Sequence, residues 1–319
     1  MRIVLLPHDL IAPLMPEQVE RVRAACPGHE LVVARDAETV ATVVPTAEVI
    51  FGDLPFDVLD LATSVRWVQS VGAGVDKIAA HLGDRPILLT GAKGVVGPQL
   101  AEHALALLLS ITRGLAAAWR TPGWEHRKQI RDAQWELTDR TICIVGMGGA
   151  GRALAGRARG LEFASVVGVD PDPMAGIDLL DALVPPERID ELLPDADVVV
   201  LMLPLTRTNV GWFGAERFAA MKQGSILVNV ARGALVQEQP LLDALRSGKL
   251  YGAGLDVTPV EPLPLGHPLW DLPNVVITPH NAGGSPRRAE RVVDGFCDNL
   301  VRYLAGKPLE GQHDRTRGF

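Results

Sequence analysis

The sequence predicts an α/β protein of two domains, each a parallel sheet flanked by helices, with a cleft between them. Two observations carry this prediction. Short apolar runs alternate with helical stretches along most of the 319 residues, which is the pattern of strand–helix units in a parallel sheet. A glycine-rich turn lies at residues 146–151, in the middle of the chain, so the runs before it must form a separate domain.

The apolar runs form two series, the first smaller than the second. Helices are expected between several of them, at 17–25, 216–221 and 240–245. The first series lies at 2–6, 30–34, 48–51, 66–69 and 86–89, and the second at 141–145, 165–169, 197–203, 225–230, 251–257 and 274–278.

The glycine-rich turn stands in a specific context. Gly146, Gly148 and Gly151 separate the apolar run 141–145 from a helical stretch, and Asp170 ends the next apolar run 19 residues after Gly151. This layout is the Rossmann fingerprint for a dinucleotide: a tight turn, a close approach of backbone to pyrophosphate, and a helix packed close to a strand. The charge of Asp170 would repel a 2′-phosphate and favours NAD over NADP. The alternative is a glycine turn that binds nothing.

The motif divides the chain by function. Residues 98–284 are expected to form an NAD-binding Rossmann domain. A last helix near 286–304 follows the final strand of this domain and could return to the first one, so a discontinuous substrate domain is predicted from residues 1–97 and 285–319. The polar tail 311–319 is expected to fray.

Composition excludes several classes of protein. A net charge of −7 and a pI near 5.6 give no general attraction to nucleic acid. Three cysteines outside any CxxC pattern, Cys26, Cys143 and Cys297, suggest neither a disulfide framework nor a metal site and fit a cytoplasmic protein. The most apolar long segment, 100–111, falls short of the ~20 residues that span a bilayer. It is expected to be a buried helix, apolar almost all round, that lies between layers or packs on a partner subunit.

Three further residues lie just beyond apolar runs of the cofactor half, where open α/β sheets bind ligands. Arg232 could bind a carboxylate with two parallel hydrogen bonds. Glu261, among prolines, and His280, before two glycines, could form a carboxylate-supported proton donor to a carbonyl. Taken singly, each has a plainer interpretation: a surface arginine, a solvated carboxylate and a structural histidine. Their joint occurrence with a dinucleotide motif favours chemistry.

The chain resembles the D-isomer specific 2-hydroxyacid dehydrogenase family over most of its length. The order and spacing of the matching motifs are specific to that family. They are 71–76 (VGAGVD), 101–105 (AEHAL), the glycine motif with Asp170, 203–206 (LPLT), 229–233 (NVARG), 254–257 (GLDV), 261–263 (EPL), 267–270 (HPLW) and 278–280 (TPH).

The resemblance implies two Rossmann-like or flavodoxin-like domains and assigns site residues. Arg232, Glu261 and His280 correspond to the catalytic residues, and Gly72, Ala73 and Gly74 to a backbone site for the substrate carboxylate, shared with Arg232. The residues expected to bind the cofactor are Gly146, Gly148, Gly149, Ala150, Gly151, Asp170, Pro204, Thr206, Val230, Ala231, Asp256 and His280.

Other residues receive smaller roles. Asp256 could bond the nicotinamide amide. His103, on the apolar helix, is expected to be a satisfied interior residue. Of the remaining histidines considered, none pairs with a carboxylate at a family-like position; these are His8, His81, His126 and His267. Ala150 replaces a usual isoleucine or valine, and the segments 94–99 and 119–135 are atypical.

The resemblance therefore implies an NAD(H)-dependent oxidoreductase, a 2-hydroxyacid dehydrogenase (EC 1.1.1.-) or glyoxylate/hydroxypyruvate reductase, that transfers a hydride between nicotinamide and a small 2-oxo or 2-hydroxy acid. Domain closure is expected to hinge near 95–99 and 283–286. A homodimer through the NAD-binding domain is expected, with no nucleic-acid, membrane or metal partner. The alternative is an NAD(H)-sensing, co-repressor-like binding protein of the same fold. An amino-acid dehydrogenase would need a lysine-based site that the sequence does not offer.

Overall fold

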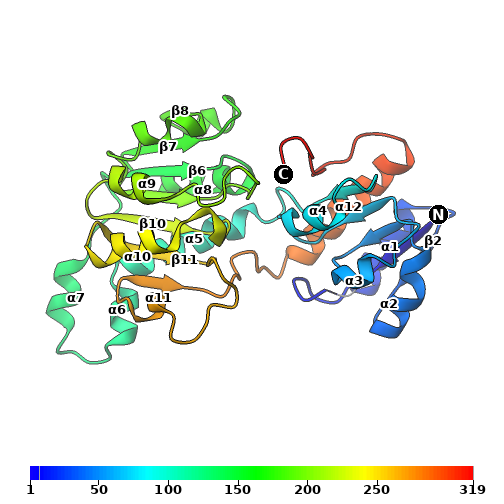
Figure 1. Ribbon diagram of the computed structural model, residues 1–319, viewed down its shortest axis with the longest axis horizontal. Helices are drawn as coiled ribbons and strands as arrows, with labels where there is room; N and C mark the ends of the chain where they lie inside the picture. The colour runs from blue at the N-terminus through cyan, green and yellow to red at the C-terminus, as the bar shows by residue number, and fades with distance from the viewer. Residues whose placement is uncertain (7, 319) are drawn as a thin grey trace. The chain divides into compact units, whose positions relative to one another are not determined.

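The computed structural model describes residues 1–6 and 8–318, in two compact units. Unit 1 comprises Met1–Val96 with Gly284–Phe319, and unit 2 comprises Gly97–Gly283; Pro7 and Phe319 lie outside the described residues. Each unit holds one sheet in which all paired strands run parallel, flanked by helices (Figure 1). The predicted fold class, two parallel sheets flanked by helices, is confirmed.

Unit 1 has a five-stranded sheet in the order β2-β1-β3-β4-β5. Strand order reverses beside β1, because the chain leaves β1 for β2 on one side and returns to β3 on the other. Its elements are β1 (Arg2–Leu5), α1 (Pro16–Ala25), β2 (Glu30–Val33), α2 (Ala37–Val43), the 3₁₀ helix η1 (Val44–Thr46), β3 (Val49–Phe51), α3 (Phe56–Leu59), β4 (Trp67–Gln69), α4 (Asp76–Leu82), β5 (Leu88–Thr90) and α12 (Arg288–Leu304).

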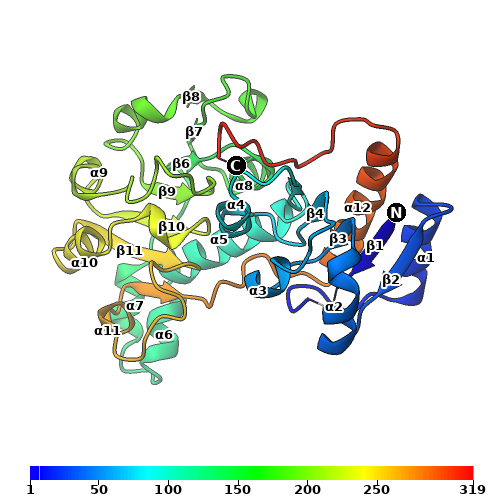
Figure 2. The ribbon, with the colours of Figure 1, turned by 45° about the vertical axis from the view of Figure 1, so that its right-hand side comes forward.

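The last helix of the chain completes the core of unit 1. Figures 1 and 2 show α12 running along the sheet beside α1. Its fully buried Phe296 contacts two aromatic side chains of the sheet, Phe51 at a ring-centroid distance of 4.6 Å and Trp67 at 5.4 Å. Since aromatic side chains bury large apolar areas, this contact fastens α12 to strands made over 200 residues earlier in the chain.

Unit 2 has a seven-stranded sheet in the order β12-β11-β10-β9-β6-β7-β8. Apolar side chains cover both faces of this sheet, as a parallel sheet requires. Its elements are α5 (Gly97–Thr112), α6 (Leu115–Arg120), α7 (Arg127–Ala133), β6 (Thr141–Val145), α8 (Gly149–Gly160), β7 (Ser165–Val169), η2 (Ile177–Leu179), β8 (Ala182–Val184), η3 (Pro186–Glu191), β9 (Val198–Leu201), α9 (Ala215–Ala220), β10 (Ser225–Asn229), η4 (Gly233–Leu235), α10 (Glu238–Arg246), β11 (Leu250–Leu255), α11 (Pro268–Asp271) and β12 (Val275–Ile277).

Helix α5 is buried along one side rather than all round. Ala101, Leu108 and Ile111 belong to the core cluster that α5 shares with α8 and the central strands. Glu102 and Ala106 are exposed. The outer face of α5 is partly exposed in this chain, and the expectation that the helix packs on a partner subunit stays a prediction.

The tail is paired with the sheet of unit 1, and the expectation that it frays was wrong for its described residues. Gln312 forms an antiparallel bridge with Thr90, and the N–H of His313 donates to the carbonyl of Leu89 at 2.8 Å. The physical reason is that β5 is an edge strand with free backbone groups. Any chain can pair with such groups, whatever the polarity of its side chains.

Candidate active site

The glycine turn after β6 has the geometry of a phosphate-binding loop. Gly146 has a φ of +98°, and a Cβ there would lie 2.8 Å from the backbone of Leu203. A Cβ on Gly151 would lie 2.0 Å from the carbonyl oxygen of Gly146, so only glycine lets α8 start this close to β6. A Cβ on Gly148 would meet nothing within 4 Å. The turn is therefore tight on its inner side and open at Gly148, where α8 presents its first N–H groups.

Asp170 follows β7 directly and is tied to this turn. Its Oδ2 accepts a hydrogen bond from the N–H of Met147 at 2.8 Å, and its Oδ1 accepts one from Asp172 at 2.9 Å. The carboxylate thus lies beside the glycine loop, and both of its oxygens have lone pairs left for a hydroxyl donor.

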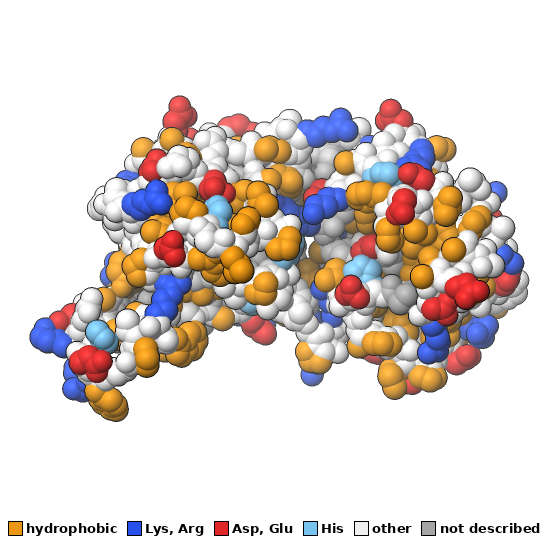
Figure 3. All heavy atoms as spheres, turned by 60° about the horizontal axis from the view of Figure 1, so that its bottom comes forward, with side chains coloured by type: hydrophobic (Ala, Val, Ile, Leu, Met, Phe, Trp, Pro, Cys, Tyr) orange, Lys and Arg blue, Asp and Glu red, His pale blue; other side chains and the backbone are white. Residues whose placement is uncertain are grey.

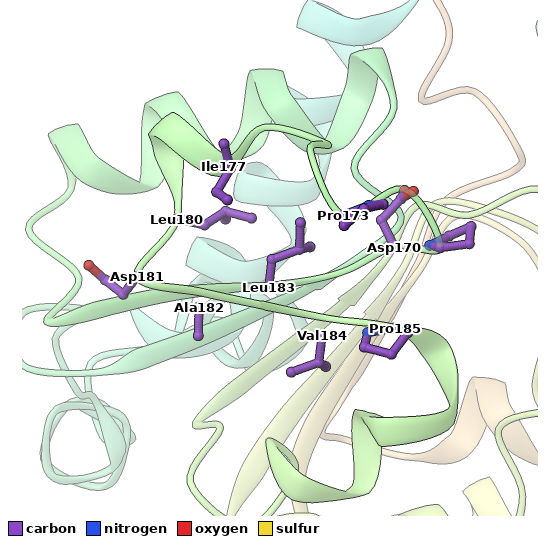
Figure 4. A pocket seen from close by; sticks show the side chains of 10 residues that line it. Asp170, Pro173, Ile177, Leu180, Asp181, Ala182, Leu183, Val184 and Pro185 are labelled. Carbon is purple, nitrogen blue, oxygen red and sulfur yellow. The ribbon is translucent and has the colours of Figure 1, made fainter.

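A cavity of about 360 Å³ adjoins Asp170. Figure 4 shows Asp170 at one end of its lining and Asp181 at the other, with mainly apolar side chains between them. These come from the segment after β7 and from β8, and include Pro173, Leu180 and Leu183. A space of this size with polar ends and apolar walls suits a flat, partly apolar group.

Arg232 lies just beyond β10, in a loop that Asn229 shapes. The Asn229 side chain accepts from the N–H of Ala231 and donates to the carbonyl of Arg232, both at 3.0 Å. Gly233 follows because a Cβ there would lie 2.0 Å from the backbone of Thr258. The guanidinium donates to the carbonyl of Ala231 at 2.8 Å and is partly exposed. The loop therefore holds the arginine at a fixed point on the carboxyl edge of the sheet.

His280 and Glu261 form the pair that the sequence suggests. Nδ1 of His280 lies 2.8 Å from Oε2 of Glu261, and Oε1 of Glu261 accepts from the N–H of Thr258 at 3.1 Å. With its carboxylate partner on Nδ1, the ring carries a proton there, so Nε2 is the nitrogen that faces other groups. Both side chains are accessible, His280 at 48% and Glu261 at 32%.

The backbone of His280 takes an uncommon conformation. Its φ is +51°, in the left-handed region, which a non-glycine residue enters at a cost and often at functional positions. The surrounding loop enforces it, since the N–H of His280 donates to the carbonyls of Asp256 and Thr278 at 2.8 and 3.0 Å. The imidazole is therefore held in a direction that an extended strand end would not give.

Arg232, Glu261 and His280 follow three strands that are neighbours in one sheet. Strand β10 pairs with β11, and β11 with β12. The carboxyl ends of parallel strands meet at the same edge, which places all three residues at one edge of unit 2.

Asp256 anchors the segment that follows β12, and this residue is only 2% exposed. Its carboxylate accepts hydrogen bonds from the Thr278 hydroxyl and from the N–H groups of Asn281 and Ala282, at 2.7, 2.9 and 3.0 Å. The sequence suggested a nicotinamide contact for Asp256, which stays a prediction. The anchoring role of Asp256 was not predicted. The feature that could have indicated it is an acidic residue directly after the apolar, glycine-rich run of β11.

The other expected cofactor residues surround these loops. Pro204 and Thr206 lie in the turn after β9, held by Asn209, which accepts from the N–H of Thr206 at 2.7 Å and donates to the carbonyl of Pro204 at 2.8 Å. Val230 and Ala231 are buried after β10. Gly149 is exposed and Ala150 half-buried in the first turn of α8.

In unit 1, the loop Gly72–Gly74 follows β4. The N–H of Gly72 donates to Oγ of Ser70 at 3.0 Å. Within the described part of the chain, the N–H groups of Ala73 and Gly74 donate to no backbone or side-chain acceptor. Two backbone donors are thus available at the carboxyl end of this sheet, as the expected carboxylate site requires.

Several histidines pair with carboxylates outside the expected pair. His103 lies 2.8 Å from the hydroxyl of Thr278 and 3.4 Å from Asp256, which agrees with a satisfied, partly buried residue. The other pairs are His8–Asp53, His81–Asp60, His126–Glu125 and His267–Glu238. The described residues contain no cluster of three or more potential metal ligands, and no helix among them is both long and apolar enough to cross a bilayer.

Comparison with known proteins identifies the family. The model of the D-isomer specific 2-hydroxyacid dehydrogenase NAD-binding domain matches residues 105–282. Glyoxylate/hydroxypyruvate reductase B of Citrobacter koseri is 36% identical over 255 residues, which cover 78% of each chain.

Two solved structures are similar along nearly the whole chain. A D-isomer specific 2-hydroxyacid dehydrogenase family protein from Aeromonas salmonicida has a TM-score of 0.81 and 32% identity, with 98% of both chains covered. A D-isomer specific 2-hydroxyacid dehydrogenase from Xanthobacter autotrophicus, solved with NADPH and MES, has a TM-score of 0.80 and 28% identity, with 99% of both covered. The motif order, the two parallel sheets and these matches together show that the chain belongs to the D-isomer specific 2-hydroxyacid dehydrogenase family.

Proposed function

We propose that the protein is an NAD(H)-dependent oxidoreductase that interconverts a small 2-oxo acid and the corresponding 2-hydroxy acid. The observation that carries this proposal is the 2.8 Å contact between His280 and Glu261, at the same sheet edge as Arg232. A proton donor, a supporting carboxylate and a carboxylate-binding cation are the groups that carbonyl reduction of an acid needs.

Each residue has one role in this proposal. Arg232 binds the substrate carboxylate, together with the N–H groups of Ala73 and Gly74. His280, protonated, stabilises the negative charge that develops on the carbonyl oxygen and then delivers a proton from Nε2. Glu261 orients the ring through Nδ1 and stabilises its cationic form. When bound, nicotinamide supplies the hydride in reduction and takes it in oxidation.

The test is loss of NADH absorbance with a panel of 2-oxo acids that includes glyoxylate and hydroxypyruvate. His280→Ala should lower kcat by ~10² to 10⁴, the range of acid–base assistance, while NADH still binds. His126→Ala is the matched control, because His126 also pairs with a glutamate but lies at the start of α7. Wild-type turnover by His280→Ala would refute the proposed role.

The same panel separates an enzyme from a sensor. If none of the 2-oxo acids is turned over while NADH still binds, the result would favour the NAD(H)-sensing alternative. Glu261→Gln should lower kcat in an active enzyme, because the neutral amide no longer stabilises the protonated ring.

For the cofactor we propose NADH over NADPH. Asp170 beside the glycine loop favours ribose hydroxyls and repels a 2′-phosphate. The Xanthobacter relative was solved with NADPH, and kinetics with both cofactors test the preference. Asp170→Ser should lower the ratio of kcat/KM for NADH to that for NADPH, whereas Asp172→Asn, two residues along, should leave it nearly unchanged. We assign the 360 Å³ cavity next to Asp170 to the adenine ring.

We propose a homodimer through unit 2. The helices α6 and α7 project from the sheet of this unit (Figure 1), and on this arm Trp119 is 72% exposed and Trp124 86% exposed. Figure 3 shows hydrophobic and charged side chains mixed on one face of the molecule. Large exposed apolar side chains mark interaction surfaces. Light scattering at micromolar concentration should give a dimer, and Trp119→Ser with Trp124→Ser should shift it toward monomer.

The three free thiols suit a reducing, cytoplasmic setting.

A further inference from the structure

The loop Gly72–Gly74 packs against the residue that follows β5. Strand β5 pairs with β4, so both strands end at the same edge of the unit 1 sheet. Gly91 is the first residue after β5, and a Cβ there would lie 2.9 Å from the carbonyl oxygen of Ala73 and 3.2 Å from that of Gly72. Both distances are shorter than an ordinary contact, so the loop can lie this close only because residue 91 is a glycine.

The carbonyl groups of two consecutive peptides are fixed on this side of the loop. The carbonyl oxygen of Gly72 accepts a hydrogen bond from the N–H of Ala92 at 2.8 Å, and the carbonyl oxygen of Ala73 is the atom nearest to the Cβ position of Gly91. Both peptide bonds are trans, and in a planar trans peptide the N–H points opposite to the C=O. The N–H groups of Ala73 and Gly74 therefore point away from the segment 91–92.

The preceding peptide, between Val71 and Gly72, is held at both of its polar groups. Its carbonyl oxygen accepts a hydrogen bond from the guanidinium of Arg288 at 3.1 Å, and its N–H donates to Oγ of Ser70 at 3.0 Å. Arg288 and Ser70 are buried, at 6% and 1% exposed. The N–H of Gly72 is thus used inside the protein, and the donors that remain for a ligand start at Ala73.

The tail of the chain holds Gly91 in place. The N–H of Gly91 donates to the carbonyl of Gly311 at 3.1 Å, and a Cβ on Gly311 would lie 2.5 Å from the carbonyl oxygen of Gly91. The buried Asn299 of α12 binds the backbone of the neighbouring Glu310 twice, donating to its carbonyl at 3.0 Å and accepting from its N–H at 2.8 Å. Gly91 therefore lies between two fixed segments and has little room to move.

We propose that Gly91 is a positioning residue for the substrate. It holds the carbonyl groups of the loop, so that the N–H groups of Ala73 and Gly74 stay together on the opposite side, where consecutive donors can bind a carboxylate. The inference rests on the proposed function, in which these two N–H groups and Arg232 bind the substrate carboxylate. Gly91 acts through the loop, and its contribution is to affinity for the acid group rather than to proton or hydride transfer.

Gly91→Ala tests this role, because the new methyl group has to displace the loop or the tail. KM for glyoxylate should rise by ~10-fold or more, the effect of losing one hydrogen bond to a charged group, and kcat should change less. The inhibition constant of oxamate, which carries the carboxylate but is not reduced, should rise by a similar factor. The Kd for NADH should keep its wild-type value, since the glycine loop belongs to unit 2.

Gly295→Ala is the matched control. It makes the same substitution in unit 1, on α12, where a Cβ would meet nothing within 4 Å, and it should leave both constants unchanged. Ser70→Ala is a milder second variant, which releases the N–H of Gly72 and should raise both constants by ~3-fold or more. Its control is Ser64→Ala at an exposed position.

The outcomes separate the two proposals. KM and the inhibition constant do not depend on the fraction of folded protein, so a less stable variant still gives an answer. If the wild-type enzyme reduces 2-oxo acids and both constants are unchanged in Gly91→Ala, the positioning role is refuted and the proposed function stands. An equal rise in the Kd for NADH would show a general disturbance and would also refute the role.

Two further results decide as well. If Gly91→Ala gives no folded protein, Ser70→Ala decides by the same criterion. Absence of turnover by the wild-type protein with every acid would overturn the proposed function, and this inference with it.

Discussion

The hydroxyl of Thr278 donates a 2.7 Å hydrogen bond to Oδ1 of Asp256, which joins the ends of the adjacent strands β12 and β11. His103 on α5 contacts the same hydroxyl at 2.8 Å. The segment between Thr278 and Ala282 carries His280, so the direction of the imidazole depends on a buried carboxylate that need not touch the substrate.

Asp256→Asn should therefore impair the enzyme without removing a proposed catalytic group. The side chain of asparagine would place its NH₂ group opposite a group that also donates. Each buried polar group left without a hydrogen bond costs ~1–3 kcal/mol. We expect a lower melting temperature and kcat reduced by ~10-fold or more. Thermal unfolding and steady-state kinetics measure the two effects, with Asp271→Asn on the exposed end of α11 as control. Unchanged kcat and stability would show that the anchor is dispensable.

Two glycines of helix α8 should respond to alanine in opposite ways. Gly151→Ala places a Cβ 2.0 Å from the carbonyl oxygen of Gly146, so the glycine turn must shift, at a cost of ~1–3 kcal/mol or more, and NADH affinity should fall. Gly156→Ala meets nothing within 4 Å and should stabilise the helix by ~1 kcal/mol. Chemical denaturation and NADH titration provide both readouts. Equal effects of the two substitutions would contradict the close packing at Gly151.

Acid should destabilise unit 2 through Asp197. Burial opposes ionisation of this carboxyl, but hydrogen bonds from Lys222, the N–H of Thr141 and Arg140 outweigh it, so its pKa lies below the ordinary value. A lowered pKa in the folded state means that the unfolded chain binds the proton more tightly. The stabilisation is therefore present above the ordinary carboxyl pKa and is lost as pH falls through the folded value.

Unfolding midpoints measured from about pH 6 to about pH 2 should show this loss. Asp197→Asn should be less stable than wild type at neutral pH and should lose less on acidification. Asp195→Asn, an exposed neighbour, should follow the wild-type curve. Parallel curves for wild type and Asp197→Asn would exclude the proposed linkage.

The cysteines should resist alkylation in the folded protein. Burial raises the pKa of the Cys143 thiol to about 12 and that of Cys297 to about 11, and it also raises the pKa of Cys26. Since the thiolate is the reactive form, iodoacetamide at pH ~8 should label the native chain slowly and the denatured chain at all three positions. Rapid native labelling at Cys143, found by peptide mass spectrometry, would contradict its place in β6.

The sheets could be predicted from the sequence because parallel strands buried on both faces are short, continuous apolar runs. Strand β8 was missed. Its three residues, Ala182–Val184, form the edge of the seven-stranded sheet and are only partly buried. They follow Asp181 and precede Pro185. An apolar run of three residues between such neighbours is too short to be recognised as a strand. The pairing of the tail with the edge strand β5 was also not predicted. Backbone groups form this pairing, so the side chains of the tail do not indicate it.

The sequence predicts the site residues that belong to recognisable motifs. Arg232, Glu261 and His280 lie at neighbouring strand ends because the topology brings those ends together. The supporting contacts could not be read from spacing: His103 and Thr278 are 175 residues apart, and their contact depends on the rotation of α5. The same holds for the contact between His8 and Asp53, which no motif or spacing predicts. Contacts of this kind depend on side-chain direction, which periodicity does not encode.

The place of α12 in unit 1 affects the order in which this chain can fold during synthesis. Unit 2 is one continuous segment, so it can fold on the ribosome once its last strand has emerged. The five-stranded sheet has to wait, since Phe51 and Trp67 gain their aromatic partner Phe296 only after all of unit 2 has been made. Until then that sheet exposes the apolar face that α12 covers in the finished chain.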